Sequence, residues 1–301
     1  MYDLIVIGGG PAGLTATTYA IRKHLNVLMV TKDLGGKTNY RLAIPWIQDY
    51  QVISGLETVN KFRSELEYLE FARHMDLADK VTKTKDHFIV TTRGGAEFKA
   101  RAVIVATGTK QVRLDVPGEK QYIMKGLCYS ALSYAALFLD RTTVIVGEGE
   151  MALRAAGELS TVCKQVYLVS SKGELPASPL ASKLQSASNV KLLLGHEVVE
   201  VKGDEYARSV LVKNPKGKVT EIITDGTFIA MALNPNSKLV DGLVNLDPQG
   251  HIIVDSANRT NVPGIFAAGD VASGYAEQVL IAMGEGAKAA LSAYEYLLPM
   301  L

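Results

Sequence analysis

The sequence predicts an α/β fold of two similar domains, because one supersecondary unit occurs in it twice. An apolar strand, a glycine turn and a helix rich in small residues follow one another at residues 4–20 and again at residues 143–159. Continuous apolar runs of this kind are typical of strands buried in parallel sheets. A further strand follows each helix, at 26–31 and at 166–169. The repeat therefore predicts two Rossmann-like domains, each a three-layer ββα arrangement.

The composition excludes several classes of protein. The 301 residues are 48% hydrophobic, which is enough for two domains of ordinary size, and 32 basic against 31 acidic residues leave a net charge of +1. This balance gives no global field for nucleic acid or for an anionic membrane. Two cysteines cannot build a disulfide framework, and we find neither a signal peptide nor an apolar run of roughly 18 residues. We expect a soluble cytoplasmic protein without a metal site, because no Cys/His spacing suits one.

The first glycine turn carries the fingerprint of a dinucleotide site. Gly8, Gly10 and Gly13 follow a strand and open a helix, with Pro11 and Ala12 between the last two glycines. The first glycine permits the tight turn, the second lets the backbone approach a pyrophosphate, and the third lets the helix pack on the sheet. The amino end of the helix then holds the anion. These five residues are predicted to bind the diphosphate of a cofactor.

Three more segments are predicted to line the same site. Asp33 lies close to the position, about 20 residues further on, from which a carboxylate can bind a ribose hydroxyl. Thr107 and Gly108 end one apolar strand, and Gly269 and Asp270 end another, so that the backbone can come close to a ligand at the carboxyl edge of the sheet. Asp270 is placed to accept a hydrogen bond from a ribityl hydroxyl.

In their order along the chain, these motifs resemble those of the low-molecular-weight thioredoxin reductases. The motifs that carry the resemblance are residues 8–13, 35–36, 105–108, 233–236 and 262–270. The resemblance implies a thioredoxin reductase-like homodimer. It also implies an FAD-binding domain in two segments, 1–113 and 242–301, around an inserted NAD(P)-binding-like domain at 114–241.

The same resemblance assigns further residues to the flavin site. Gly36 belongs to the Gly35-Gly36 motif, and Lys37 stands where the family usually has Gln. Asp49 stands where the family usually has Asn, and Trp46 is expected nearby. Gln278 is expected at the head of a helix against the flavin ring.

The family's redox-active Cys-x-x-Cys is missing. The matching stretch, 126–134, aligns Ser130 and Ser133 with the two cysteines and Tyr134 with the acid that follows them. A hydroxyl can neither store electrons in a bond to its neighbour nor form the attacking thiolate, so dithiol exchange at this place is excluded. The changed surroundings, Tyr134 among them, favour a natural loss. Cys128 remains a candidate catalytic thiol, although a buried, inert state is the expectation for it and for Cys163.

The second glycine turn departs from a functional nucleotide site. Gly147, Gly149 and Ala152 keep the pattern, but Glu148 and Glu150 place carboxylates where a pyrophosphate should rest. After the next strand, Ser170 and Lys172 stand in place of the Arg-rich cluster that binds the 2′-phosphate of NADPH in the family. We expect weak or absent NAD(P)H binding, with a second flavin as an alternative occupant.

These features predict an FAD-dependent oxidoreductase whose electrons follow another route than NADPH to Cys-x-x-Cys. Ferredoxin or a second flavin is the candidate donor, and ferredoxin or a thioredoxin-like protein the candidate partner. One alternative is a disulfide reductase that uses Cys128 with another thiol. A second alternative is a flavin-binding regulatory protein without catalysis.

Overall fold

The chain forms two compact units in the computed structural model, which describes residues 1–50 and 55–301. The first unit consists of Met1–Asn39, Ile53–Lys110 and Asn234–Leu301, and the second of Tyr40–Val52 and Gln111–Leu233. The chain passes between the units at four places, and β7 (Thr109–Gln111) and β16 (Leu233–Pro235) are two of them. The first unit is therefore discontinuous in sequence.

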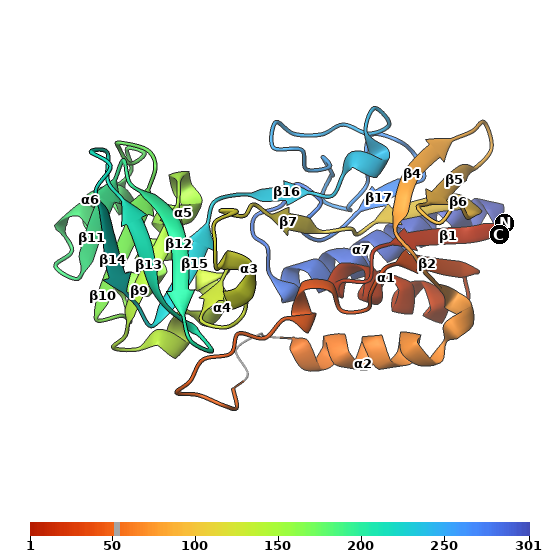
Figure 1. Cartoon of the computed structure of the whole chain (residues 1–301). Helices are drawn as coiled ribbons and strands as arrows, with labels where there is room; N and C mark the ends of the chain where they lie inside the picture. Colours follow the sequence, from red (N-terminus) through yellow and green to blue (C-terminus); the bar gives the residue numbers. More distant parts are fainter. Residues whose placement is uncertain (51–54) are drawn as a thin grey trace. The chain divides into compact units, whose positions relative to one another are not determined.

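The first unit is built on a sheet with the strand order β3-β2-β1-β6-β5-β4, in which β17 also pairs with β6 (Figure 1). Pairing is parallel between β1, β2, β3, β6 and β17 and antiparallel along β4, β5 and β6. The strands are β1 (Tyr2–Ile7), β2 (Val27–Thr31), β3 (Arg73–Met75), β4 (Ala78–Lys83), β5 (Phe88–Thr92), β6 (Glu97–Val105) and β17 (Ile265–Ala267). The helices are α1 (Pro11–Arg22), α2 (Leu56–Tyr68) and α7 (Val279–Leu297), with short 3₁₀ turns at Gly36–Asn39, Glu70–Ala72, Lys238–Val240 and Leu298–Met300.

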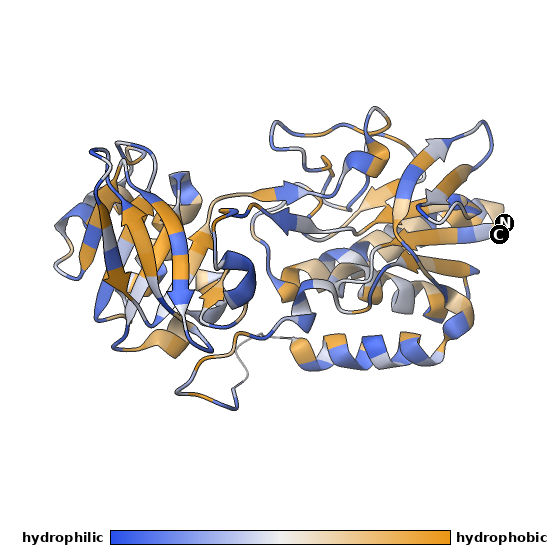
Figure 2. Ribbon diagram, in the orientation of Figure 1, coloured by the Kyte–Doolittle hydropathy of each residue, from blue (hydrophilic) through white to orange (hydrophobic). Residues whose placement is uncertain are grey.

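The two faces of this sheet are covered by different layers, because successive strand residues point to opposite sides. Leu4 and Val6 pack with small residues of α1 and α7 on one face. Ile5 and Ile7 pack on the other face with residues of β4, β5 and the 239–252 segment. Figure 2 shows hydrophobic residues gathered on the strands, whereas α2 carries hydrophilic and hydrophobic residues in alternation.

The second unit repeats this plan. Its parallel sheet has the order β11-β10-β9-β15-β8, and a separate antiparallel sheet has the order β12-β13-β14. The strands are β8 (Leu127–Cys128), β9 (Thr142–Gly147), β10 (Gln165–Ser170), β11 (Val190–Leu194), β12 (Glu197–Gly203), β13 (Ala207–Lys213), β14 (Val219–Ile223) and β15 (Gly226–Ala230). The helices are α3 (Glu119–Tyr122), α4 (Ala131–Tyr134), α5 (Gly149–Ser160) and α6 (Pro179–Ser186), with a 3₁₀ turn at Ala135–Phe138.

The core of the second unit has the same layered structure. Ile145 and Leu168 face α5 and α6, whereas Val144 and Val169 face the antiparallel sheet. Parallel strands between a helical layer and a β layer confirm the predicted fold class of two Rossmann-like, three-layer domains.

The two units differ from the predicted domain bounds in three segments, since residues 111–113 group with the second unit and residues 234–241 with the first. Residues 40–50 were placed in the first domain, but they group with the second unit. The cause is hydrophobic, since Leu42 and Ile44 are buried in the core around α5. Trp46 packs edge-on against Phe138, with 5.4 Å between ring centroids, and its indole Nε1–H donates to the Leu137 carbonyl over 2.9 Å.

Several elements match their sequence predictions closely, and others were missed. The strands predicted at 26–31 and at 166–169 form β2 and β10. The strands that were not predicted include β3, β4, β7, β8, β14, β15 and β16, because short or mixed strands give little periodic signal. Within the described residues, no helix combines the length and apolarity needed to cross a bilayer.

The packing of α7 on α1 leads to a stability prediction. A Cβ added at Gly286 would collide with the Ala12 carbonyl oxygen, whereas one added at Gly284, in the same helix, meets nothing within 4 Å. We expect Gly286→Ala to lower the free energy of unfolding by about 1–3 kcal/mol in urea denaturation, because backbone cannot yield as a side chain can. Gly284→Ala should raise it by roughly 0.5–1 kcal/mol through helix propensity. Equal changes in the free energy of unfolding for the two substitutions would contradict this account of how α7 packs on α1.

Candidate functional site

The first glycine turn is shaped by close contacts between backbone segments. A Cβ at Gly8 would collide with the Ala106 carbonyl, and one at Gly13 with the Gly8 carbonyl. Gly8 also has a φ of +113°, which favours glycine. These two glycines are therefore required by the protein's own packing, as the fingerprint predicts.

Gly10 differs from its neighbours, because space lies open in front of it. A Cβ added there would meet nothing within 4 Å, and the backbone φ of −73° is ordinary. Gly10 is the N-cap of α1, Pro11 and Ala12 begin the helix, and the first turn carries no acidic residue. An open backbone at the positive end of a helix is the geometry that a diphosphate requires. These residues fit an FAD diphosphate.

The segment after β2 folds back over this turn. Gly35 N donates to the Gly9 carbonyl over 2.7 Å, and a Cβ at Gly36 would lie 3.0 Å from the Gly10 Cα. The Asp33 carboxylate accepts a hydrogen bond from Gly36 N over 3.0 Å. Asp33 thus holds the loop that borders the glycine turn, and its side chain remains 39% exposed at the carboxyl end of β2.

Lys37 and Asp270 form an ion pair at the same edge of the sheet. The Lys37 ammonium lies 2.8 Å from Asp270 Oδ2 and donates to Thr109 Oγ1 over 2.6 Å. The Asp270 side chain is only 15% exposed. A carboxylate held in this way has a fixed orientation, which suits the predicted role of accepting a hydrogen bond from a ligand hydroxyl.

The remaining strand ends are tied to one another. The Thr107 hydroxyl donates to the Asn236 carbonyl over 2.8 Å, and the Asn236 amide returns a bond to the Thr107 carbonyl over 2.9 Å. Gly108 has a φ of +65° and accepts from Asn236 N over 2.9 Å. Gln278 is the N-cap of α7, so it stands at a helix head as the resemblance implies.

Sequence reasoning missed Glu285 of α7. Its carboxylate accepts a hydrogen bond from Gly269 N over 2.8 Å, and burial raises the pKa of this carboxyl. Glu285, His251, Gly269 and Asp270 line part of a cavity of about 250 Å³ in the first unit. No sequence signal links a mid-helix Glu to a strand end 16 residues earlier, so only the fold reveals this contact.

Asp49 is the predicted flavin residue that the structure does not group with the others. It lies in the second unit, its side chain is fully exposed, and its closest cation is Arg41 at 3.9 Å. Trp46, expected near the flavin, also belongs to the second unit, and the other predicted flavin residues belong to the first.

The second glycine turn resembles the first in outline and differs in its backbone. A Cβ at Gly147 would collide with the Ala230 carbonyl and approach the Ala152 Cβ to 3.1 Å, so Gly147 packs as Gly8 does, whereas Ala152 carries a Cβ where the first repeat has Gly13. The left-handed residue, however, is Gly149, with a φ of +64°, whereas Gly8 holds that conformation in the first turn. Glu148 is the N-cap of α5, and Glu150 lies in its first turn.

The Glu148 carboxylate is bonded to the segment after β10. Ser171 Oγ donates to one carboxylate oxygen, and the Lys172 ammonium lies 4.0 Å from the other. Ser170 is buried and accepts from Lys172 N over 3.2 Å. The predicted second site therefore contains a carboxylate beside its predicted cation.

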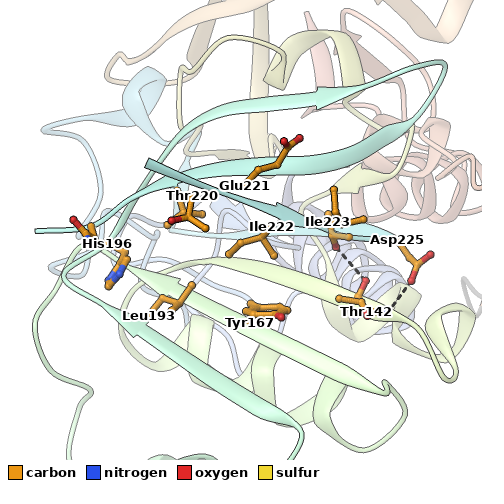
Figure 3. Close-up of a pocket in the computed structure, with 12 residues that line it drawn as sticks. Thr142, Tyr167, Leu193, His196, Thr220, Glu221, Ile222, Ile223 and Asp225 are labelled. Atoms are coloured by element: carbon orange, nitrogen blue, oxygen red, sulfur yellow. Dashed lines mark hydrogen bonds between the residues drawn. The ribbon is translucent and has the colours of Figure 1, made fainter. Parts of the chain in front are cut away.

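A separate hollow of about 620 Å³ lies between the parallel sheet and the β12–β14 sheet of the second unit. Figure 3 shows Tyr167 and Leu193 on one side of it and Thr220 and Ile222 on the other. The second glycine turn is not among its lining residues. The hollow is thus distinct from the predicted nucleotide site.

Ser130 and Ser133 lie in hydrogen-bond contact. Ser130 is the N-cap of α4, accepts from Ser133 N over 3.3 Å, and donates to Ser133 Oγ over 2.9 Å. Tyr134 is buried, its hydroxyl donates to the Tyr40 carbonyl over 3.4 Å, and burial raises its pKa to about 12. The two side chains that were predicted to align with the family's cysteines are thus adjacent and joined by a hydrogen bond.

The two cysteines are free thiols in separate surroundings. Cys128 is 1% exposed, and burial raises its pKa to about 12. Burial also raises the pKa of Cys163 to about 11, and its sulfur lies 3.6 Å from Thr143 Oγ1. Both environments disfavour a thiolate. Among residues 1–50 and 55–301, no group of three His, Cys, Asp or Glu side chains could hold a metal ion.

The chain matches known proteins along almost its whole length. A family model described as pyridine nucleotide-disulphide oxidoreductase matches residues 2–286. The F subunit of alkyl hydroperoxide reductase from Staphylococcus aureus (strain NCTC 8325 / PS 47) is 32% identical over 300 residues, which are 99% of this chain and 59% of that protein. The chain thus spans about three fifths of the curated relatives it matches.

Solved structures are also similar to this chain along almost its whole length. The thioredoxin reductase from Streptococcus pyogenes MGAS5005 is 35% identical and has a TM-score of 0.89, with 99% of each chain covered. The thioredoxin reductase from Giardia duodenalis is 27% identical and has a TM-score of 0.86, also with 99% of each chain covered.

The open space at Gly10 gives a test of the diphosphate site. Gly10→Ala should cost less than about 1 kcal/mol of stability in the protein without cofactor, since the added methyl meets no protein atom. It should weaken FAD binding at least about tenfold in calorimetry, because the methyl fills the space that a diphosphate needs.

Gly13→Ala is the matched control, because its added Cβ would collide with the Gly8 carbonyl. It should destabilise the protein itself, by about 1–3 kcal/mol. Unchanged FAD affinity in the Gly10 variant would show that the diphosphate lies elsewhere.

Proposed function

Because the chain belongs to the pyridine nucleotide-disulphide oxidoreductase family, we propose that it transfers electrons through FAD without a Cys-x-x-Cys dithiol and without efficient use of NADPH. It is an FAD-dependent oxidoreductase with a thioredoxin reductase-like fold. The observation that supports the proposal is the hydrogen bond between Ser130 Oγ and Ser133 Oγ, at 2.9 Å, at the two positions that the resemblance aligns with the family's cysteines.

The first unit supplies the residues that hold FAD. The backbone at Gly10 and the amino end of α1 bind the diphosphate, and Asp33 is placed for the adenosine ribose. Asp270, oriented by Lys37, accepts a hydrogen bond from the ribityl chain. When bound, FAD supplies a ring that accepts and releases electrons.

Two carboxylates of the second unit oppose the binding of NADPH. Lys172 is the cation predicted to meet a 2′-phosphate, and it already lies 4.0 Å from the Glu148 carboxylate. Glu150 adds a second negative charge at the head of α5. Both carboxylates oppose the binding of a further anion. Ferredoxin or a second flavin is the donor that we propose in place of NADPH.

The family resemblance also suggests the assembly and the partners. We propose a cytoplasmic homodimer that exchanges electrons with a ferredoxin or a thioredoxin-like protein. The similar thioredoxin reductase and the similar subunit of alkyl hydroperoxide reductase support a redox-protein partner, although this chain spans only part of the curated relatives' length.

Anaerobic reduction of the bound flavin tests the route of the electrons. We expect reduced ferredoxin to bleach the flavin in stopped-flow at least about a hundredfold faster than NADPH at equal concentration. Dithionite serves as the control that the flavin is reducible, and the bound flavin is counted per chain in the same preparation. Two flavins per chain would assign the second unit to a flavin. Bleaching by NADPH as fast as by ferredoxin would overturn the proposal.

Burial of Cys128 predicts a thiol that does not react in the folded protein. A pKa raised from 9.0 to about 12 leaves about a thousandfold less thiolate at pH 8 than an ordinary thiol has. We expect slow labelling by iodoacetamide below pH 9, rising towards pH 12, and rapid labelling after unfolding.

Cys128→Ser should accordingly leave flavin reduction unchanged, and Cys163→Ser is the control for loss of a buried thiol elsewhere. A Cys128 variant that alone loses turnover on disulfides would favour a disulfide reductase instead.

A further inference from the structure

We propose that Glu148 is the specificity-determining residue of the second nucleotide site. It would restrict that site to adenine nucleotides whose ribose 2′-hydroxyl is free. This inference rests on the proposed function, since it explains the exclusion of NADPH. It goes further by naming what the site accepts: the adenosine diphosphate part that NADH and FAD share.

The internal repeat shows where the residue at position 148 points. Gly9 is its equivalent in the first turn, since both follow the first glycine of the motif. A Cβ at Gly9 would collide with the Asp33 carbonyl and approach Thr31 Oγ1 to 2.7 Å. This position therefore faces the end of the strand that follows the helix. Glu148 does the same in the second unit, because its carboxylate contacts Ser171 directly after β10.

Each unit thus places one carboxylate near the end of the strand that follows the helix, but the carboxylate comes from a different segment of the chain in each unit. In the first unit the chain after β2 provides Asp33, and the glycine turn has no side chain at position 9. In the second unit the chain after β10 provides Ser171 and Lys172, and the glycine turn provides Glu148. A carboxylate at the end of this strand accepts hydrogen bonds from a ribose diol in dinucleotide-binding folds. Glu148 offers the same kind of acceptor from the glycine turn, instead of from the segment that follows the strand.

The same carboxylate acts against a 2′-phosphate in two ways. It repels the phosphate directly, and it engages Lys172, whose ammonium lies 4.0 Å from Glu148 Oε2. A phosphate entering between the two would have to break this pair. A ribose hydroxyl carries no charge, so it can donate to Glu148 while the pair persists.

The rest of the turn still permits a nucleotide to approach. A Cβ at Gly149 would meet nothing within 4 Å, as at Gly10 in the first unit. Glu150 lies at the head of α5 and weakens the binding of any diphosphate, whatever the ribose carries. Weak overall affinity and selectivity for the ribose therefore come from different carboxylates.

Calorimetry with two adenine nucleotides separates these contributions. The protein is first loaded with FAD, so that the first site is filled, and is then titrated with ADP-ribose or with 2′-phospho-ADP-ribose. We expect ADP-ribose to bind at least about tenfold more tightly. Glu148→Gln keeps the side-chain length and removes the charge, and it should reduce this ratio to about twofold or less.

Glu150→Gln is the matched control, because it removes a carboxylate from the same turn. It should strengthen the binding of both nucleotides and leave their ratio unchanged. Equal affinity of the unaltered protein for both nucleotides, or no detectable binding of either, would overturn the assignment. A change of the ratio in Glu150→Gln as large as in Glu148→Gln would overturn it too.

The outcome is independent of the proposed electron route. Calorimetry measures nucleotide binding without any electron transfer, whereas the proposed function is tested by the rate of flavin bleaching. Fast bleaching by NADPH together with a preference for ADP-ribose would refute the function and leave the role of Glu148 intact. Slow bleaching by NADPH together with equal affinity for the two nucleotides would support the proposed function and refute the role of Glu148.

Discussion

The close approach of three backbone segments at residues 8–13 is the constraint on which the first unit depends. The carbonyl of Gly8 occupies the space of a Cβ at Gly13, and the carbonyl of Ala106 occupies that of a Cβ at Gly8. The end of β1, the end of β6 and the start of α1 therefore meet without side chains between them. This contact fixes the direction in which α1 begins, and the space in front of Gly10 at the amino end of the helix stays open.

The second unit keeps the contact between strand and glycine turn but has different side chains at the positions that can face a ligand. Gly147 packs against the Ala230 carbonyl as Gly8 packs against the Ala106 carbonyl, so the strand and the helix remain in contact. The residues that do not pack have diverged, since Glu148 and Glu150 lie where the first turn has Gly9 and Pro11. Packing and ligand binding make separate demands on one short turn, and here only the packing demand is the same in both copies.

The fold class could be predicted well and the first glycine turn could be located, because their signals are local. A strand, three glycines and a helix identify a dinucleotide turn within about ten residues. The contact of Lys37 with Asp270 could not be predicted, since it joins positions 233 residues apart. The grouping of residues 40–50 with the second unit was also missed. It depends on where Leu42, Ile44 and Trp46 find apolar neighbours, and hydrophobic composition alone does not say which core they join.

The pair formed by Ser130 and Ser133 also determines how the protein responds to its surroundings. Two thiols at this place would form a disulfide under oxidising conditions and lose it under reducing conditions. Each change would alter the covalent structure at the start of the short helix α4. Two hydroxyls joined by a hydrogen bond have a single chemical state in oxidising and in reducing conditions. This place in the chain is thus inert towards oxidants, so any sensitivity of the protein to oxidative stress has to arise at other residues or at a bound cofactor.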